Sequence, residues 1–160
     1  MEKVISFFSE ETSFLLDNED SIYDWILNFI KDKGYKIYEI NYIFCSDDYL
    51  LGLNREYLDH DYYTDILTFP YEVPLEKTLF SDIYISVDRV KANADEFHSS
   101  FEDELHRVMI HGILHLMGFD DHDDEDDDDD GDNEMTMTTM SRRQRRRRQR
   151  RRRRREGVGR

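Results

Sequence analysis

The spacing of apolar and polar positions changes several times along the first 118 residues, and each period indicates a type of secondary structure. Short runs that alternate, or that are rich in β-branched and aromatic residues, predict strands at 4–8, 36–44, 65–69 and 82–87. Apolar residues that recur every three or four positions predict helices at 21–34, 46–57, 88–97 and 100–117. The polar and aromatic segment 59–64 has no period and predicts a loop. The chain is therefore expected to mix helices and strands.

The last predicted helix carries the most chemical information. Ser100 is expected to begin it, and Gly118 follows its last apolar residue as the expected C-terminal stop. Apolar side chains occur on nearly every side, which predicts a buried helix at the centre of the core. Three histidines interrupt this apolar surface, namely His106, His111 and His115. For His106 alone, a hydrogen-bonded core histidine is the simpler interpretation.

The pair formed by His111 and His115 indicates a metal site. Residues four apart lie on one face of a helix, about 5–6 Å from each other, so two imidazoles at this spacing can bind one transition-metal ion. Burying both without partners would cost on the order of 1–3 kcal/mol for each unmet hydrogen bond. Gly112 points the same way, because a glycine inside a helix costs about 1 kcal/mol relative to alanine and indicates a close approach to the backbone.

A third ligand must come from beyond this helix or from another segment, and Gly118 permits the chain to turn back. Asp121 and His122 both follow, but neighbouring side chains in an extended segment point in opposite directions, so we expect only one of them to bind. Zinc prefers an imidazole to a lone carboxylate, which favours His122. Three protein ligands leave a fourth position for water, as in catalytic zinc sites, where the metal lowers the pKa of that water towards about 7.

The pattern resembles the HExxHxxGxxH helix of zinc proteases, with one departure. Gly112 stands where those enzymes have their general-base glutamate, so the usual machinery of peptide hydrolysis is absent. A metal-bound hydroxide can still attack a phosphodiester or another ester, which leaves a nuclease or an esterase open.

At the same residues the chain resembles the YbeY family of bacterial metal-dependent endoribonucleases. The family motif H-G-x-L-H-L-x-G-x-D-H is matched by residues 111–120 up to its last position. Two more stretches match in order, L-N-x-x-Y followed by T-D-I-L-T-F within 53–69 and D-I-Y-I-S-x-D-R-V at 82–90. The resemblance covers residues 1–122 and implies an α+β fold, a small mixed β-sheet packed with helices, with one zinc ion at the mouth of a cleft. It also implies a cytoplasmic, single-strand-specific endoribonuclease that acts on RNA, in particular rRNA, in rRNA maturation and ribosome assembly, with ribosomal components as partners.

Departures from the family pattern affect the candidate site. The family's third ligand usually lies ten positions after the first histidine, which is Asp121 here, and the histidine is displaced to His122, so the two stay alternatives. Many members have an arginine directly after the motif tyrosine, where an RNA phosphate is held. This chain has Leu58 there, and Arg55, which lies three residues earlier, is interpreted first as a solvated surface charge.

Charge divides the chain into two predicted parts. Residues 1–119 hold nine Lys or Arg against 24 Asp or Glu, which opposes binding to polyanionic RNA. Residues 120–134 then hold twelve acids, and 142–160 hold thirteen arginines. Like-charge runs of this length are normally disordered, so we predict a YbeY-like metal-dependent hydrolase domain at 1–122 and a low-complexity tail at 123–160. The acidic run is expected to sequester much of the arginine run.

Two further features narrow the class of protein. No stretch reaches 18 apolar residues, which predicts no membrane span. The lone Cys45 excludes a disulfide framework and fits a reducing compartment such as the cytoplasm. We expect Cys45 to lie in the core.

Three functions compete at this point. The leading hypothesis is the zinc-dependent endoribonuclease, in which metal-bound water attacks a phosphodiester. Arg89 and His60 are then candidate phosphate or outer contacts, although a surface ion pair and an exposed loop position explain them more simply. The second hypothesis is a metal-bound ribosome assembly factor with little catalysis. The third, a metalloprotease-like hydrolase, rests on the HxxxH spacing alone and is weakened by Gly112.

Overall fold

The computed structural model describes residues 3–118 and 137–139. In chain order the elements are β1 (Ile5–Glu10), α1 (Glu19–Asp32), β2 (Lys36–Cys45), α2 (Asp47–Leu58), β3 (Ile66–Pro70), β4 (Thr78–Ser86), α3 (Val87–Glu96), α4 (Phe101–Leu116) and β5 (Met137–Thr139). Each of the strands and helices predicted from the sequence is present, with boundaries that differ by a few residues. No helix within the described residues is long and apolar enough to span a membrane.

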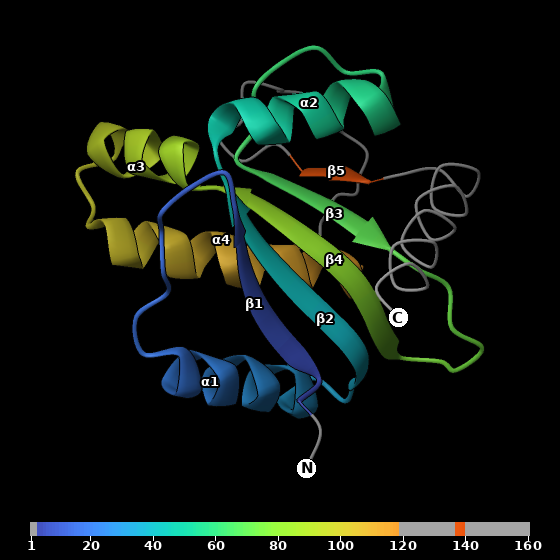
Figure 1. Ribbon diagram of the computed structural model, residues 1–160. Helices are drawn as coiled ribbons and strands as arrows, with labels where there is room; N and C mark the ends of the chain where they lie inside the picture. The colour runs from blue at the N-terminus through green and yellow to red at the C-terminus, as the bar shows by residue number, and fades with distance from the viewer. Residues whose placement is uncertain (1–2, 119–136, 140–160) are drawn as a thin grey trace, which may run out of the picture.

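The strands form one mixed sheet in the order β1-β2-β4-β3-β5 (Figure 1). β1 runs parallel to β2, and β2 runs parallel to β4. β3 is antiparallel to β4 and parallel to β5. Parallel neighbours need a crossover connection, and α1 supplies it between β1 and β2. The expected α+β class, a small mixed sheet packed with helices, is confirmed.

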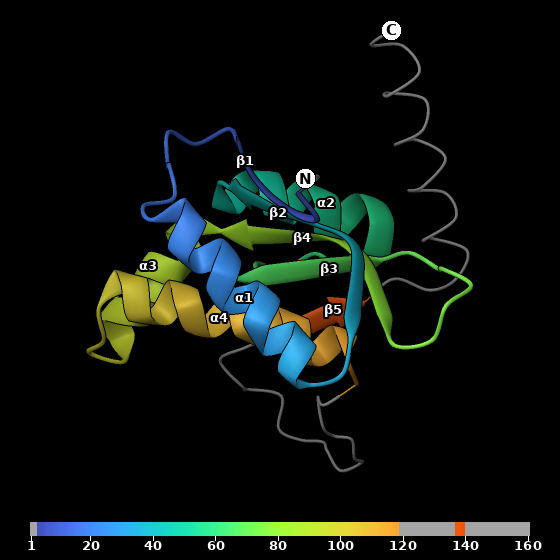
Figure 2. The same cartoon turned by 90° about the horizontal axis from the view of Figure 1, so that it is seen from below.

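Helices cover both faces of the sheet (Figures 1 and 2). α1 and α4 lie against one face, and α2 lies against the other. The larger apolar core joins α1, α3 and α4 to the sheet and includes Ile26, Ile30, Tyr42, Ile83, Met109 and Ile113. The smaller core lies under α2 and includes Cys45, Leu50, Phe69 and Tyr84. Cys45 is fully buried, so its expected core position is confirmed.

Serine caps explain where three of the helices begin. Ser46, Ser86 and Ser100 have extended backbones, and each hydroxyl accepts a hydrogen bond from the amide three residues later, at 3.1, 3.1 and 3.0 Å. Such a bond satisfies one of the free amides of the first turn. The helix starts predicted at Ser46 and Ser100 are confirmed. α1 instead begins two residues before the predicted Ser21, after Asn18 in a left-handed conformation.

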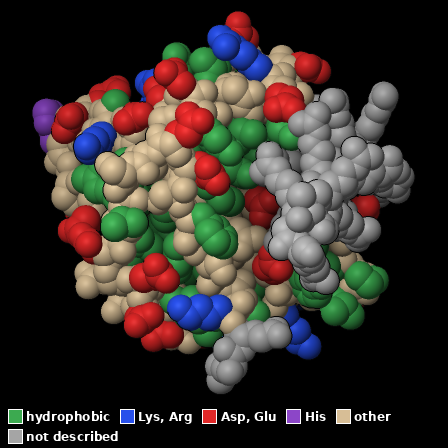
Figure 3. Space-filling view, in the orientation of Figure 1, with side chains coloured by type: hydrophobic (Ala, Val, Ile, Leu, Met, Phe, Trp, Pro, Cys, Tyr) green, Lys and Arg blue, Asp and Glu red, His purple; other side chains and the backbone are tan. Residues whose placement is uncertain are grey.

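Acidic side chains are spread over the face of the molecule shown in Figure 3, and Lys and Arg occur there at fewer places. This distribution agrees with the excess of acids in residues 1–119.

The predicted domain boundary at residue 122 and most of the predicted tail lie outside the described residues, so that division stays a prediction. Three residues of the tail segment, 137–139, form β5 in register with residues 66–68 of β3.

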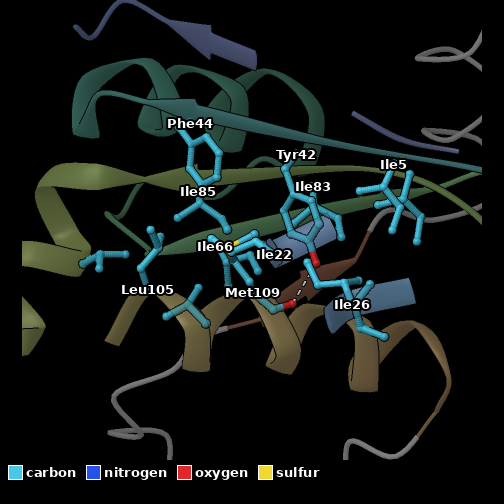
Figure 4. Packing of buried hydrophobic residues seen from close by; sticks show 14 of the residues in the cluster. Ile5, Ile22, Ile26, Tyr42, Phe44, Ile66, Ile83, Ile85, Leu105 and Met109 are labelled. Atoms are coloured by element: carbon cyan, nitrogen blue, oxygen red, sulfur yellow. Dashed lines mark hydrogen bonds between the residues drawn. The ribbon is translucent and has the colours of Figure 1, made fainter. Parts of the chain in front are cut away.

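α4 is buried on one face and half-buried on the other, which corrects the prediction of a helix buried on every side. Val108, Met109 and Ile113 are fully buried, and Met109 packs among the isoleucines of the sheet (Figure 4). Ile110 and Leu114, on the opposite side, are only half-buried. The physical reason is that the sheet covers the helix from one side, and a groove runs along the other side.

Candidate functional site

α4 places His111 and His115 on one face, one helical turn apart, as their spacing predicted. Both side chains are half-buried. On the helix circumference they belong to the stripe that also contains Glu104 and Val108. His111 borders a groove of about 360 Å³ along the outer face of α4, which is also lined by Trp25, Asp103, His106, Arg107, Ile110 and Leu114.

At Gly112, α4 packs closely against the sheet. A Cβ atom at this position would lie 2.9 Å from Cδ1 of Ile66 and 3.6 Å from Cγ2 of Ile83. The close approach inferred from the sequence is present, but its cause is the packing of the helix on the sheet. Gly112 is therefore no evidence for a metal, which corrects that inference. A glutamate here, as in zinc proteases, would be directed into the isoleucine core (Figure 4).

Two tyrosine hydroxyls hold α4 at the positions that flank the histidine pair. Tyr42 donates a hydrogen bond to the carbonyl oxygen of Met109 at 3.0 Å (Figure 4), and Tyr35 donates to that of Met117 at 3.0 Å. Burial raises the pKa of Tyr42, so its hydroxyl stays protonated and remains a donor. The two bonds fix the segment of helix between them, which is the segment that carries both candidate ligands.

The other candidate ligands, Asp121 and His122, lie outside the described residues, so the choice between them stays open. Among the described residues, no three His, Cys, Asp or Glu side chains gather closely enough to hold a metal ion. The described part of the site supplies the two imidazoles of His111 and His115. Imidazole nitrogen is a preferred zinc ligand, so the chemistry of this donor pair fits the expected metal.

His106 lies on the outer side of α4, which corrects its interpretation as a core histidine. It is half-buried, and its ring centroid lies 5.4 Å from that of Trp25 on α1. Trp25 is itself 41% exposed, although it belongs to the apolar stripe of α1, whose members Ile22 and Ile26 are buried. Helical spacing alone does not separate the buried centre of such a stripe from its exposed margin.

A buried carboxyl that sequence reasoning missed lies at the start of β3. Asp65 is 2% exposed; its Oδ2 accepts a hydrogen bond from Asn93 at 3.4 Å, and its Oδ1 has no partner among the described residues. Burial raises the pKa of Asp65 from 3.8 to about 7. The nearby charges of Arg107 and Glu104 act on it in opposite directions. The sequence signal that could have indicated its burial is the position of Asp65 directly before the strand segment 66–69, whose residues are apolar or small.

The other residues considered as phosphate contacts have protein partners. Arg89 Nη2 forms an ion pair with Asp47 Oδ2 at 2.7 Å, which confirms the simpler interpretation of Arg89. Arg55 is paired with Asp61 on the surface. His60 lies in the loop after α2 and stacks on a tyrosine ring with centroids 5.2 Å apart. Each of these groups is therefore already in contact with another side chain of the protein.

Known proteins resemble the chain over most of its length. The family model described as Endoribonuclease YbeY matches residues 5–143. The proteins named Endoribonuclease YbeY from Cytophaga hutchinsonii and Flavobacterium johnsoniae are 51% and 50% identical over 120 and 114 residues, which cover 75% and 71% of this chain and 83% and 81% of theirs. The solution structure of TM1509 from Thermotoga maritima is similar with a TM-score of 0.50 and 31% identity, and the match covers 72% of this chain and 73% of that one.

Proposed function

This chain belongs to the YbeY family of endoribonucleases, and we propose on that basis that it is a zinc-dependent enzyme that cleaves single-stranded RNA. We place its role in rRNA maturation and ribosome assembly in the cytoplasm, with rRNA and ribosomal components as partners. The observation that supports the proposal most directly is the histidine pair of α4. His111 and His115 share a half-buried face, and His111 opens onto a groove that a substrate can enter.

His111 and His115 would supply two of three zinc ligands, and Asp121 or His122 would supply the third. Zinc bound at such a site supplies Lewis-acid polarisation of a phosphoryl oxygen and activates a water molecule for attack. The protein's own contribution is rigidity. The tyrosine hydroxyls on the carbonyls of Met109 and Met117 and the contact of Gly112 with the sheet hold in place the helical segment that carries both histidines.

Net charge does not favour RNA binding by the folded part, so local features must supply the affinity. Residues 1–119 carry 24 acids against nine Lys or Arg, which repels phosphates at long range. Arg107 lines the groove beside His111 with its side chain 46% exposed; its charge is paired with the buried Glu104, and its guanidinium provides hydrogen-bond donors at this point. In this proposal the thirteen arginines of 142–160 add RNA affinity that falls steeply with salt, because it depends on counterion release.

The test is metal content and RNA cleavage in one set of variants. We expect the purified protein to contain about one equivalent of zinc and to cleave a single-stranded RNA. His115→Ala should lose the zinc and slow cleavage at least about a hundredfold, since even residues behind the ligands change activity by 10- to 100-fold. Asp121→Ala and His122→Ala, compared with each other, identify the third ligand by which of them loses the metal.

His98→Asn is the matched control, because His98 is exposed, has φ of 56° and lies outside the groove. Asparagine tolerates that left-handed backbone, so the control should keep both zinc and activity. Less than half an equivalent of zinc in the parent protein would rule out the metal-based mechanism. Equal cleavage by the parent and His115→Ala would assign the activity to a contaminant.

A second candidate function is a metal-bound ribosome assembly factor with little catalysis, and the burial of Leu58 favours it. Leu58 is 7% exposed in the core under α2, and Arg55 is held by Asp61. The arginine that many family members place after the motif tyrosine therefore has no equivalent at these positions. Stoichiometric zinc without RNA cleavage would support this candidate over the nuclease.

A further inference from the structure

The only tryptophan of the chain lies at the surface beside the candidate metal-binding helix. Trp25 is 41% exposed on α1, and its ring faces His106 of α4 at a centroid distance of 5.4 Å and an interplanar angle of 58°. Burying a tryptophan stabilises a fold more than burying most other side chains. Ile22 and Ile26 on the same helix are buried, so the exposure of Trp25 is local to this point.

Two adjoining grooves meet at Trp25 and His106. One, of about 360 Å³, follows the outer face of α4 to His111. The other, of about 460 Å³, lies at the first turns of α1 and α4 and is also lined by Asp17 and Glu102. His106 and His111 are five positions apart, which is roughly 7–8 Å along the helix axis. A ligand bound in the first groove, between Trp25 and His111, would therefore lie next to the proposed metal ligands.

The chemistry of the groove favours a flat, uncharged group over a phosphate near Trp25. Asp103 lines the groove beside the indole, and an acidic side chain there repels a phosphate. Ile110 and Leu114 provide apolar walls. Towards His111, the guanidinium of Arg107 supplies positive charge while Glu104 holds it in place with contacts of 3.1 and 2.6 Å. The groove thus has an aromatic end at Trp25 and, towards His111, an arginine that is paired with Glu104.

We propose that the Trp25 groove is a subsite for one unpaired nucleobase of the RNA, which stacks on the indole and places the neighbouring phosphate near Arg107 and His111. The inference rests on the proposed function for the identity of the ligand. Aromatic side chains bind bases of single strands by stacking, whatever the sequence. A paired base in a duplex has no free face to offer, so this subsite gives a physical basis for a preference for single strands.

Because Trp25 is the only tryptophan, its fluorescence reports on this subsite without labels. We expect a single-stranded RNA oligonucleotide to quench it within the first turnover after mixing, and the same sequence in a duplex to quench it far less. Trp25→Leu should raise KM for single-stranded RNA about tenfold, within the range for one stacked base, with kcat changed less than about threefold. Trp25→Phe, which keeps an aromatic face, should restore much of the affinity.

Tyr38→Leu is the matched control, because Tyr38 is 58% exposed on β2 and does not line either groove. It should leave KM unchanged. Cleavage by the parent protein without fluorescence change, or an unchanged KM in a folded Trp25→Leu protein, would overturn the subsite and leave the nuclease proposal intact. Quenching by single-stranded RNA without any cleavage would support the subsite and overturn the nuclease proposal.

Discussion

The face of α4 that meets the sheet and the face that meets solvent use similar residue types but are packed to different degrees. Met109 and Ile113 on the inner face are fully buried, and between them Gly112 leaves no room for a side chain. Ile110 and Leu114 on the outer face are half-buried and line a groove. Side chains on the inner face must fit closely against the sheet, whereas the groove on the outer face leaves space for a ligand. The two candidate metal ligands, His111 and His115, lie at the border between the two faces.

Truncating an isoleucine on each face should produce the largest contrast. Ile113→Ala is expected to lower the free energy of unfolding by about 3–4 kcal/mol, because it leaves a cavity between helix and sheet. Ile110→Ala should cost about 1 kcal/mol or less, since the side chain is already half in water. Urea unfolding followed by circular dichroism measures both. Equal losses would show that the two faces are packed alike.

The buried carboxyl at the start of β3 gives the next largest effect, and its sign follows from its raised pKa. Asp65 titrates at about 7 when folded and near 3.8 when unfolded, so the native state binds more protons between these values. The stability due to its protonated form is present below about pH 4 and is lost as the pH rises through about 7. Asp65→Asn should remove this slope and be more stable than the parent at pH 8 by roughly 2–4 kcal/mol, since each pKa unit corresponds to about 1.4 kcal/mol.

Thermal unfolding across pH 4–8 tests the sign for Asp65. The charges that act on the carboxyl include Arg107, Arg89 and Glu104, and none of them is changed in this variant. Asp95→Asn, an exposed acid on α3, is the control and should leave the slope unchanged. A parent protein whose stability rises between pH 5 and 8 would contradict the assignment of Asp65.

Two helical glycines give the smallest effect, with opposite signs. Gly112→Ala should destabilise the fold by about 1 kcal/mol, because the methyl group must displace buried Ile66 and this outweighs the gain in helix propensity. Gly52→Ala should stabilise by about 0.5–1 kcal/mol, since Gly52 lies exposed within α2 with no atom within 4 Å of an added Cβ. The two melting temperatures, compared with that of the parent, should move in opposite directions. If both substitutions stabilise the protein, α4 can shift away from the sheet far enough to accommodate the added methyl group.

Most strands and helices could be predicted from short-range features of the sequence. Period and composition located the strands and helices of the first 118 residues, and hydroxyl caps fixed the starts at Ser46 and Ser100. The histidine spacing placed two candidate ligands on one face because helical geometry is the same in every helix. These predictions depend on residues within about four positions of each other, so they need no knowledge of tertiary packing.

The predictions that were wrong or missing depend on contacts between distant segments. α4 is apolar nearly all round, so only the position of the sheet decides which side is inner. The exposure of Trp25 follows from how α1 lies beside α4, and the burial of Asp65 follows from α3 and α4 packing over the start of β3. The pairing of 137–139 with β3 likewise joins residues about 70 positions apart in the sequence.

The lone thiol of the chain offers a measure of how the smaller core opens. Cys45 is fully buried under α2, its sulfur lies 3.6 Å from the carbonyl oxygen of Ile85, and burial raises the pKa of the thiol. A thiol-reactive reagent can therefore modify the native protein only when this region opens. The labelling rate in buffer, divided by the rate for the unfolded chain, gives the free energy of that opening. A value well below the global free energy of unfolding would show that the core around Cys45 opens without unfolding of the whole protein.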